Sequence, residues 1–178
     1  MSRIGKREII LPATVSAELN GNIITVKGQL GTLSREIAHD IKVVIEGNKI
    51  EVINENNDPE LSKFHGLYRQ LINNMVVGVS QGYQKALTVS GVGFKLTQNG
   101  NDVTMNIGLS HPVVVKAIDG ITLAIDKNNL IVRGIDKELV GKFASSVRDI
   151  KPVEPYHAYG IYYADENVRR KERKTGKK

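Results

Sequence analysis

The chain has 178 residues, of which 40% are hydrophobic and 25% charged, with a formal net charge of +6 and no cysteine. This hydrophobic content supports one large core or two smaller ones, which excludes disorder throughout. The lack of cysteine excludes a disulfide framework and thiolate metal ligands, as expected in the cytoplasm. No segment approaches the roughly eighteen consecutive apolar residues that a membrane-spanning helix needs.

The first third of the chain carries the pattern of short antiparallel strands. Residues 15–19 alternate between apolar and polar side chains, and residues 22–26 and 42–45 are rich in β-branched side chains. Dipeptides typical of tight turns, Asn-Gly at 20–21 and Gly-Asn at 47–48, follow two of these runs. We therefore expect β-hairpins in this region.

After Asn57 the apolar spacing changes to that of an amphipathic helix. Asp58 is the expected N-cap, and Pro59 occupies the expected first helical position. The residues expected on its inner face are Leu61, Phe64, Tyr68, Leu71, Met75 and Val79.

The same order of elements recurs 79 or 80 residues later. GNIITV from Gly21 aligns with GNDVTM from Gly100, and IKVVI from Ile41 aligns with ITLAI from Ile121. A second helix is expected after Asp136, and it should end before the proline at position 152. Its expected inner face is Leu139, Phe143, Val147 and Ile150.

The repeat predicts an α+β fold made of two tandem, structurally similar domains. Each should be a small, mostly antiparallel sheet packed on one helix. The predicted boundaries are residues 1–82 for the first domain and 83–155 for the second, with a Tyr-rich and basic extension at 156–178.

Enzyme signatures in the chain are weak. The GxSxG spacing at 78–82 resembles a nucleophile elbow, but a predicted helix precedes the serine and a predicted strand follows it, the reverse of the elbow order. We interpret this segment as a glycine-rich linker. SGVGF at 90–94 lacks the third glycine of a phosphate-binding loop and fits a strand bulge or close backbone approach. The four histidines lack the spacing of zinc ligands. We predict no catalytic residue, metal, cofactor or small-molecule substrate.

The last twelve residues contain seven basic residues and one acidic residue, Glu172, so this tail carries a charge equal to that of the whole chain. The first 166 residues are therefore electrically balanced. The basic residues are Arg169, Arg170, Lys171, Arg173, Lys174, Lys177 and Lys178. A charge run of this kind also fits a solvated chain end.

Four of the six tyrosines lie just before this tail, at Tyr156, Tyr159, Tyr162 and Tyr163. Aromatic rings stack on unpaired bases while Lys and Arg neutralise phosphates, so the combination favours RNA as the partner. The tyrosines could instead pack the extension against the second domain. An anionic membrane would attract the same charge, but nothing nearby would insert into it. We predict no membrane partner.

Four segments, spread over the whole chain and in the right order, resemble one family, the sixth protein of the bacterial large ribosomal subunit. They are SRIGKREIILP, ITVKGQLGTLSREI, SGVGFKLTQNG with IGLSHPVVVKAIDGI, and PVEPYHAYGIYYADENVRRKERKTGKK. The resemblance includes the duplication. It implies a structural ribosomal protein that binds large-subunit ribosomal RNA through the second domain and the tail. The implied place is the stalk base, near the sarcin-ricin loop, neighbouring large-subunit proteins and the site of translational GTPases.

The resemblance also implies RNA-facing positions. Tyr156 and Gly160 match the family's closing pattern, as do Arg169, Arg170 and Lys171. In the second domain, Lys95 and the loop of Ser110 and His111 also match the family. An ordinary strand residue at Lys95 and an ordinary turn at Ser110 and His111 are an equally good interpretation. In the family, basic residues are usual at the positions of His157, Tyr159 and Tyr162. We hypothesise that these three side chains contact the RNA by stacking or hydrogen bonding instead. Gln29 and Leu30 replace the usual Pro-Lys, so that turn is not assigned to RNA.

Two other functions stay open at this point. The chain could be an RNA-binding protein that acts outside the ribosome. An enzyme is the more distant alternative.

Overall fold

The structure is a computed structural model that describes the chain except for residues 1–2, 38–40, 55–60, 173 and 175–178. The chain divides into two compact units. The first comprises residues 1–83 and 135–137, and the second comprises residues 84–134 and 138–178. The first hairpin region therefore lies in one unit, and the tyrosine-rich segment lies in the other.

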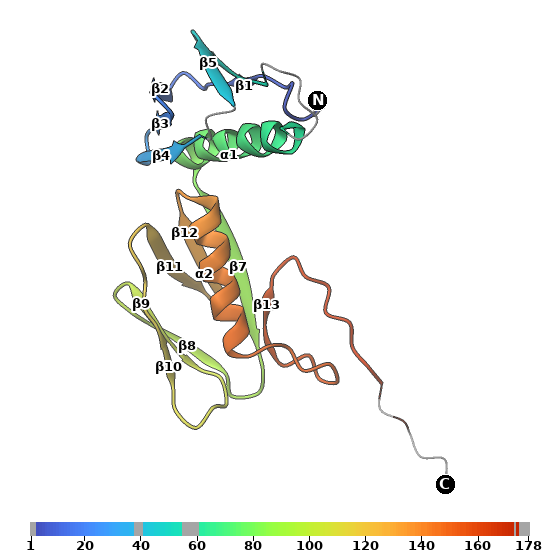
Figure 1. Ribbon diagram of the computed structural model, residues 1–178. Coiled ribbons are helices and arrows are strands. Elements are labelled where there is room, and N and C mark those ends of the chain that lie inside the picture. The colour runs from blue at the N-terminus through green and yellow to red at the C-terminus, as the bar shows by residue number, and fades with distance from the viewer. Residues whose placement is uncertain (1–2, 38–40, 55–60, 173, 175–178) are drawn as a thin grey trace. The chain divides into compact units, whose positions relative to one another are not determined.

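The described residues of the first unit form two three-stranded sheets and one long helix (Figure 1). One sheet has the order β1-β6-β5 and the other β2-β3-β4, and all pairings within them are antiparallel. The elements are β1 (Ile9–Ile10), β2 (Ser16–Asn20), β3 (Ile23–Lys27), β4 (Thr32–Glu36), β5 (Lys42–Glu46), β6 (Lys49–Ile53) and α1 (Ser62–Gln81).

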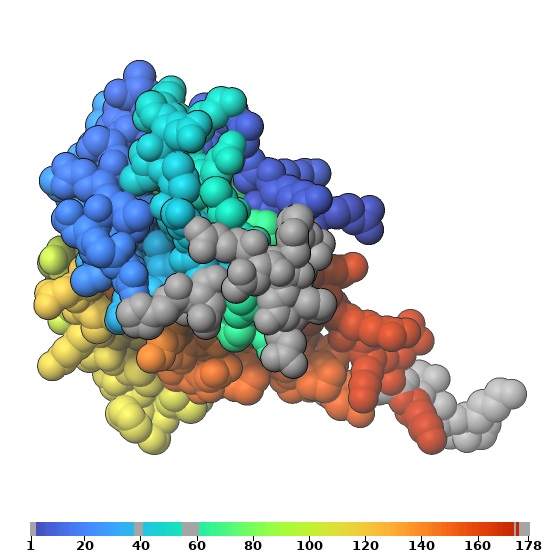
Figure 2. All heavy atoms as spheres, turned by 45° about the horizontal axis from the view of Figure 1, so that its top comes forward, coloured from blue at the N-terminus to red at the C-terminus, as the bar shows by residue number. Residues whose placement is uncertain are grey.

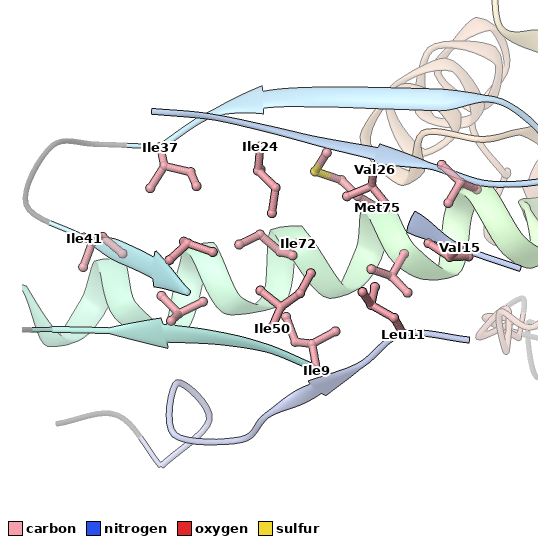
Figure 3. Close-up of a cluster of buried hydrophobic side chains, with 14 residues drawn as sticks. Ile9, Leu11, Val15, Ile24, Val26, Ile37, Ile41, Ile50, Ile72 and Met75 are labelled. Carbon is pink, nitrogen blue, oxygen red and sulfur yellow. The ribbon is translucent and has the colours of Figure 1, made fainter. Parts of the chain in front are cut away.

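The core of this unit lies where both sheets meet α1. Figure 3 shows Ile24 and Val26 of β3 pointing toward the helix from one side, and Ile50 of β6 from the other. Ile72 and Met75 of α1 fill the space between them. Ile24, Ile50 and Ile72 are completely buried, so this contact supplies much of the hydrophobic stabilisation of the unit.

The second unit repeats this plan with one additional strand. Its sheets have the orders β10-β9-β8 and β11-β12-β7-β13. In Figure 1 the helix α2 lies over strands β7, β11 and β12 of the larger sheet. The elements are β7 (Tyr83–Ser90), β8 (Lys95–Asn99), β9 (Asp102–Asn106), β10 (Val113–Val115), β11 (Ile121–Asp126), β12 (Asn129–Gly134), α2 (Lys137–Ile150) and β13 (Gly160–Tyr163).

Corresponding turns in the two units have the same backbone conformation. Gly21 (φ 61°) between β2 and β3 corresponds to Gly100 (φ 63°) between β8 and β9. Gly47 (φ 57°) between β5 and β6 corresponds to Lys127 (φ 54°) between β11 and β12. Positive φ at the first turn residue is what a two-residue hairpin requires. The predicted internally duplicated α+β fold is confirmed.

Each unit nevertheless has two small sheets where the sequence predicted one. Among the described residues of the first unit, β2 pairs with β3 alone and β5 pairs with β6 alone, so the two hairpins do not join into one sheet. Both hairpins can then cover the helix from different sides, which buries more apolar surface than one flat sheet of five-residue strands would.

The predicted inner face of α1 is partly wrong. Phe64 is 38% exposed, and Leu61, Tyr68 and Leu71 are half-buried. The buried residues of the helix are His65, Ile72, Met75, Val76, Gly78 and Val79. The helix is apolar on more than one face, so spacing alone leaves its rotation ambiguous. The predicted N-cap at Asp58 and the proline at 59 lie outside the described residues.

The second helix agrees better with its prediction. It begins directly after Asp136 and ends two residues before Pro152. Phe143 and Val147 are buried as predicted, whereas Leu139 and Ile150 are half-buried. Val140 and Ala144 complete the buried stripe.

Two glycine-containing segments differ from their predictions. Residues 78–81 form the last turn of α1, where the Ser80 hydroxyl donates to the Val77 carbonyl (3.0 Å), so the segment is not a linker. Residues 91–94 form a turn between β7 and β8 rather than a bulge. Gly91 does have a close neighbour, but it is a ring rather than backbone, because a Cβ at Gly91 would lie 2.5 Å from the Phe94 ring.

Candidate nucleic-acid interface

The tyrosine-rich segment divides between the sheet and the surface. Strand β13 pairs antiparallel with β7, which places Tyr162 opposite Thr88 and Tyr163 opposite Leu87. Both tyrosines are half-buried. Tyr156 and Tyr159 lie in the loop before the strand and are 48% and 39% exposed. Two tyrosines therefore pack the segment against its unit, and two are available to a partner.

The Tyr163 ring fixes the start of the tail. Lys85 Nζ and Arg148 Cζ each lie 5.2 Å from the ring centroid, within the range of cation–π contact. The Arg148 guanidinium also donates to the Glu166 carboxylate at 3.1 Å, and the carboxylate accepts from the Tyr163 backbone N–H at 3.3 Å. The chain is held in place at least as far as Glu166.

The loop between α2 and β13 is organised by one carboxylate. Glu154 accepts hydrogen bonds from the backbone N–H groups of His157 (2.9 Å) and Tyr156 (3.2 Å). Its carboxylate also lies 3.1 Å from His157 Nδ1. The hydrogen bond from the His157 backbone is the largest of the effects that lower the pKa of the Glu154 carboxyl below its ordinary value of 4.5.

Gly160 is buried at the start of β13 and has a φ of 146°. A Cβ at this position would lie 2.7 Å from Val153 Cα and 2.8 Å from the Pro152 carbonyl oxygen. Only glycine lets the two backbone segments approach so closely. The loop therefore depends on Gly160 for its shape, and its backbone is not at the surface that Tyr156 and Tyr159 present.

The described tail residues provide the positive charge of the surface. Arg169, Arg170, Lys171 and Lys174 are exposed, and Figure 2 shows this segment in red at the surface. The Lys171 backbone N–H donates to the Pro155 carbonyl at 2.9 Å, so the tail passes beside the tyrosine loop. The predicted contacts Arg173, Lys177 and Lys178 lie outside the described residues.

The remaining predicted residues lie at two loops of the second unit. Lys95 is the exposed first residue of β8, and its partner in the sheet is Asn106 of β9. Ser110 and His111 are exposed in the loop after β9, with the serine hydroxyl 3.2 Å from His111 Nδ1. All three therefore lie toward one end of the small sheet, where β8 begins and β9 ends.

A partly buried contact joins these loops to the chain that follows α2. The Phe94 ring lies over Gly91 and next to Gly108, and Lys151 Nζ lies 5.0 Å from its centroid. Lys151 also donates to the Ile107 carbonyl at 2.6 Å. The loops that carry Lys95, Ser110 and His111 are thus fixed to the segment that leads to Tyr156.

Sequence reasoning missed the residues that organise this surface. Phe94, Lys151 and Glu154 were not singled out, although each one fixes a loop that carries a predicted contact. A carboxylate three residues before His157 was a detectable signal for a capped turn. The contact between Phe94 and Lys151 joins residues far apart in the sequence and has no local signature.

Within the described part of the chain, no group of three or more His, Cys, Asp or Glu side chains is placed to hold a metal ion. Neither helix is long and apolar enough to cross a membrane, again among the described residues. The loop of Tyr156 and Tyr159 and the tail beside it expose aromatic and cationic side chains, which suit a polyanion with accessible bases.

Comparison with known families agrees with the duplication. A family model described as ribosomal protein L6 matches residues 11–82 and again residues 90–164. The chain belongs to the ribosomal protein L6 family. The two matches coincide with the two copies that the turns reveal, so the family's repeated unit is the module described above.

Full-length relatives support the same assignment. The chain is 50% identical over 178 residues to the large ribosomal subunit protein uL6 of Enterococcus faecalis, covering 99% of this chain and 100% of that protein. It is 45% identical over 179 residues to the uL6 of Carboxydothermus hydrogenoformans, covering 100% and 98%. Membership in the family confirms the prediction of a structural ribosomal protein rather than an enzyme.

Proposed function

We propose that this protein is a structural constituent of the large ribosomal subunit and binds its ribosomal RNA. The full-length relatives carry the name of a large-subunit protein, and the sequence resemblance covers the closing segment. The observation that carries the proposal is the anchored tail, where Arg169, Arg170, Lys171 and Lys174 are exposed beside the loop of Tyr156 and Tyr159.

Binding combines two physical contributions. The folded second unit presents loops of fixed shape, which give register on an RNA surface. The tail supplies positive charge that neutralises phosphates and releases counterions. The balanced charge of the first 166 residues gives them little long-range attraction of their own.

The proposed contacts are those predicted from the sequence. Tyr156, Tyr159 and the edge of Tyr162 face the RNA together with Lys95, Ser110 and His111. The tail contributes Arg169, Arg170, Lys171, Arg173, Lys174, Lys177 and Lys178. Gly160 acts by shaping the loop, since it is buried.

We place the protein at the base of the stalk, near the sarcin-ricin loop. Neighbouring large-subunit proteins would then share its RNA site, and translational GTPases would bind close by. The resemblance to the family supports this location, and the exposed loops of the second unit offer the surface for it.

Sedimentation of a cell lysate tests the function. The protein should occur in the large subunit at one copy per particle and stay there through a high-salt wash. A peak of free protein at the top of the gradient would contradict the proposal and favour an RNA-binding role outside the ribosome. Crosslinking from residues 111 and 162 to nucleotides of the sarcin-ricin region tests the location separately.

A further inference from the structure

Two exposed rings lie against each other in the loop between α2 and β13. The ring centroids of His157 and Tyr159 are 5.4 Å apart, and the ring planes differ by 20°. The His157 side chain is 47% exposed, and Tyr159 is 39% exposed. Each ring therefore keeps surface that a third planar group could cover.

The loop holds both rings in position before any partner binds. The Glu154 carboxylate fixes the His157 backbone and also meets His157 Nδ1. The Glu154 backbone N–H donates to the Tyr159 carbonyl at 2.9 Å, and the Ala158 N–H donates to the Glu154 carbonyl at 2.9 Å. The intervening Ala158 is buried with φ 59°. A partner that stacks here does not have to order the loop.

Positive charge lies next to Tyr156, which belongs to the same loop as the two rings. Tyr156, Lys171, Glu172 and Lys174 line a surface hollow of about 510 Å³. The Lys171 backbone is tied to Pro155 at the start of the same loop. The hollow thus combines the Tyr156 ring with two ammonium groups and one carboxylate. A nucleotide can use an aromatic ring for its base and an ammonium group for its phosphate.

We propose that the stacked pair of His157 and Tyr159 is a platform for one unpaired base of RNA. In this proposal Lys171 and Lys174, which line the hollow beside Tyr156 of the same loop, neutralise the phosphates that neighbour the stacked base. The inference rests on the proposed RNA binding and adds the kind of nucleotide that is recognised.

The full-length protein and its Tyr159→Leu and His157→Leu variants test the platform. Binding is measured to transcribed large-subunit ribosomal RNA of Enterococcus faecalis, the organism of a 50% identical relative. Loss of one stacking ring should weaken binding about tenfold. Tyr159→Phe keeps the ring and should bind like the unaltered protein. The slope of log affinity against log salt should not change for Tyr159→Leu, since no phosphate contact is removed.

Phe64→Leu is a matched control, because that ring is 38% exposed in the first unit. It should bind RNA as tightly as the unaltered protein. An equal loss in this control would overturn the platform, because any exposed ring would then suffice. Unchanged affinity for both Tyr159→Leu and His157→Leu would also overturn it, while the proposed function would stand as long as the unaltered protein binds.

Ultraviolet crosslinking identifies the partner. Tyr159 or His157 should crosslink to a nucleotide that is unpaired by chemical probing of the free RNA and protected in the complex. A crosslink to a paired nucleotide, or from these rings to a neighbouring protein in the assembled subunit, would overturn the proposal. If the unaltered protein fails to bind the RNA at all, the proposed function itself fails.

Discussion

Lys127 adopts a left-handed backbone conformation with φ 54° at the turn between β11 and β12. Its counterpart in the first unit is Gly47, with φ 57°. A side chain at such a φ is strained by contact of its Cβ with the backbone, whereas glycine is not. Lys127→Gly should therefore raise the free energy of unfolding of the second unit by about 0.5 to 1 kcal/mol, measured by urea unfolding followed by circular dichroism.

Gly47→Lys is the reciprocal control. A Cβ at Gly47 has no atom within 4 Å, so only the backbone strain would change, and the first unit should lose a similar amount of stability. Equal stability of the unaltered protein and both variants would contradict the strain at this turn.

At the residue scale, local turn chemistry was predictable and long-range contacts were not. The Asn-Gly and Gly-Asn dipeptides mark the turns at Gly21 and Gly47 because the required φ is set within the turn itself. The lysine at 127 gives no such signal, and its conformation is known only from the structure. The contact between Phe94 and Lys151 depends on the packing of separate elements, so no sequence window contains it.

At the scale of single elements, the helices and hairpins followed from periodicity, but the rotation of α1 did not. Ile72 is completely buried, whereas the predicted core residue Phe64 is 38% exposed. Ile72→Ala should destabilise the first unit by about 2 to 5 kcal/mol through reduced burial and a cavity. Phe64→Ala should cost less than about 1 kcal/mol, because its ring is already in contact with water. Chemical denaturation of both variants distinguishes the observed rotation of α1 from the predicted one. The predicted rotation would give the larger loss in free energy of unfolding for Phe64→Ala.

The loop before β13 should depend on pH through Glu154. Its carboxyl pKa lies below the ordinary 4.5 because backbone N–H groups of the folded loop bind the charged form. The resulting stabilisation is present above the unfolded pKa and is lost as the pH falls through the lower folded pKa. The difference in melting temperature between the unaltered protein and Glu154→Gln should therefore be present at neutral pH and shrink in acid, below the folded pKa.

Glu172→Gln is the control for this pH effect, since it removes an exposed carboxylate of the tail. It should leave the melting temperature unchanged under both conditions. A difference between the unaltered protein and Glu154→Gln that is the same in acid and at neutral pH would show that the charge of Glu154 does not hold the loop.

At the scale of the whole molecule, the folded modules and the net charge lie in different parts of the chain. The duplicated modules account for the fold and for electrical balance, and the last twelve residues account for the net charge of +6. Composition and repeats revealed this division directly, because charge and duplication are properties of the sequence. Packing of the extension against the second domain was one of the two interpretations of its tyrosines, and it holds for Tyr162 and Tyr163. That this packing takes the form of strand β13 beside β7 could not be predicted, since an added edge strand requires knowledge of the sheet that it joins.

Truncation after Val168 tests the role of the tail. It removes all seven basic residues and Glu172, so the remaining chain has no net charge. Because the truncated protein can no longer neutralise up to seven phosphates, the slope of log affinity for large-subunit ribosomal RNA against log salt should become shallower by about 5 to 6 units. A filter-binding series across salt concentrations measures this slope, and residual binding should come from the loops of the second unit.

A variant in which residues 169–178 are scrambled separates charge from sequence in the tail. If counterion release is the main contribution, this variant keeps the steep salt dependence, because its basic residues are unchanged in number. The order of the residues should affect only the part of binding that persists at high salt, where register on the RNA matters more than attraction. An unchanged slope after truncation would mean that the phosphates are neutralised by the body of the protein, despite its balanced charge.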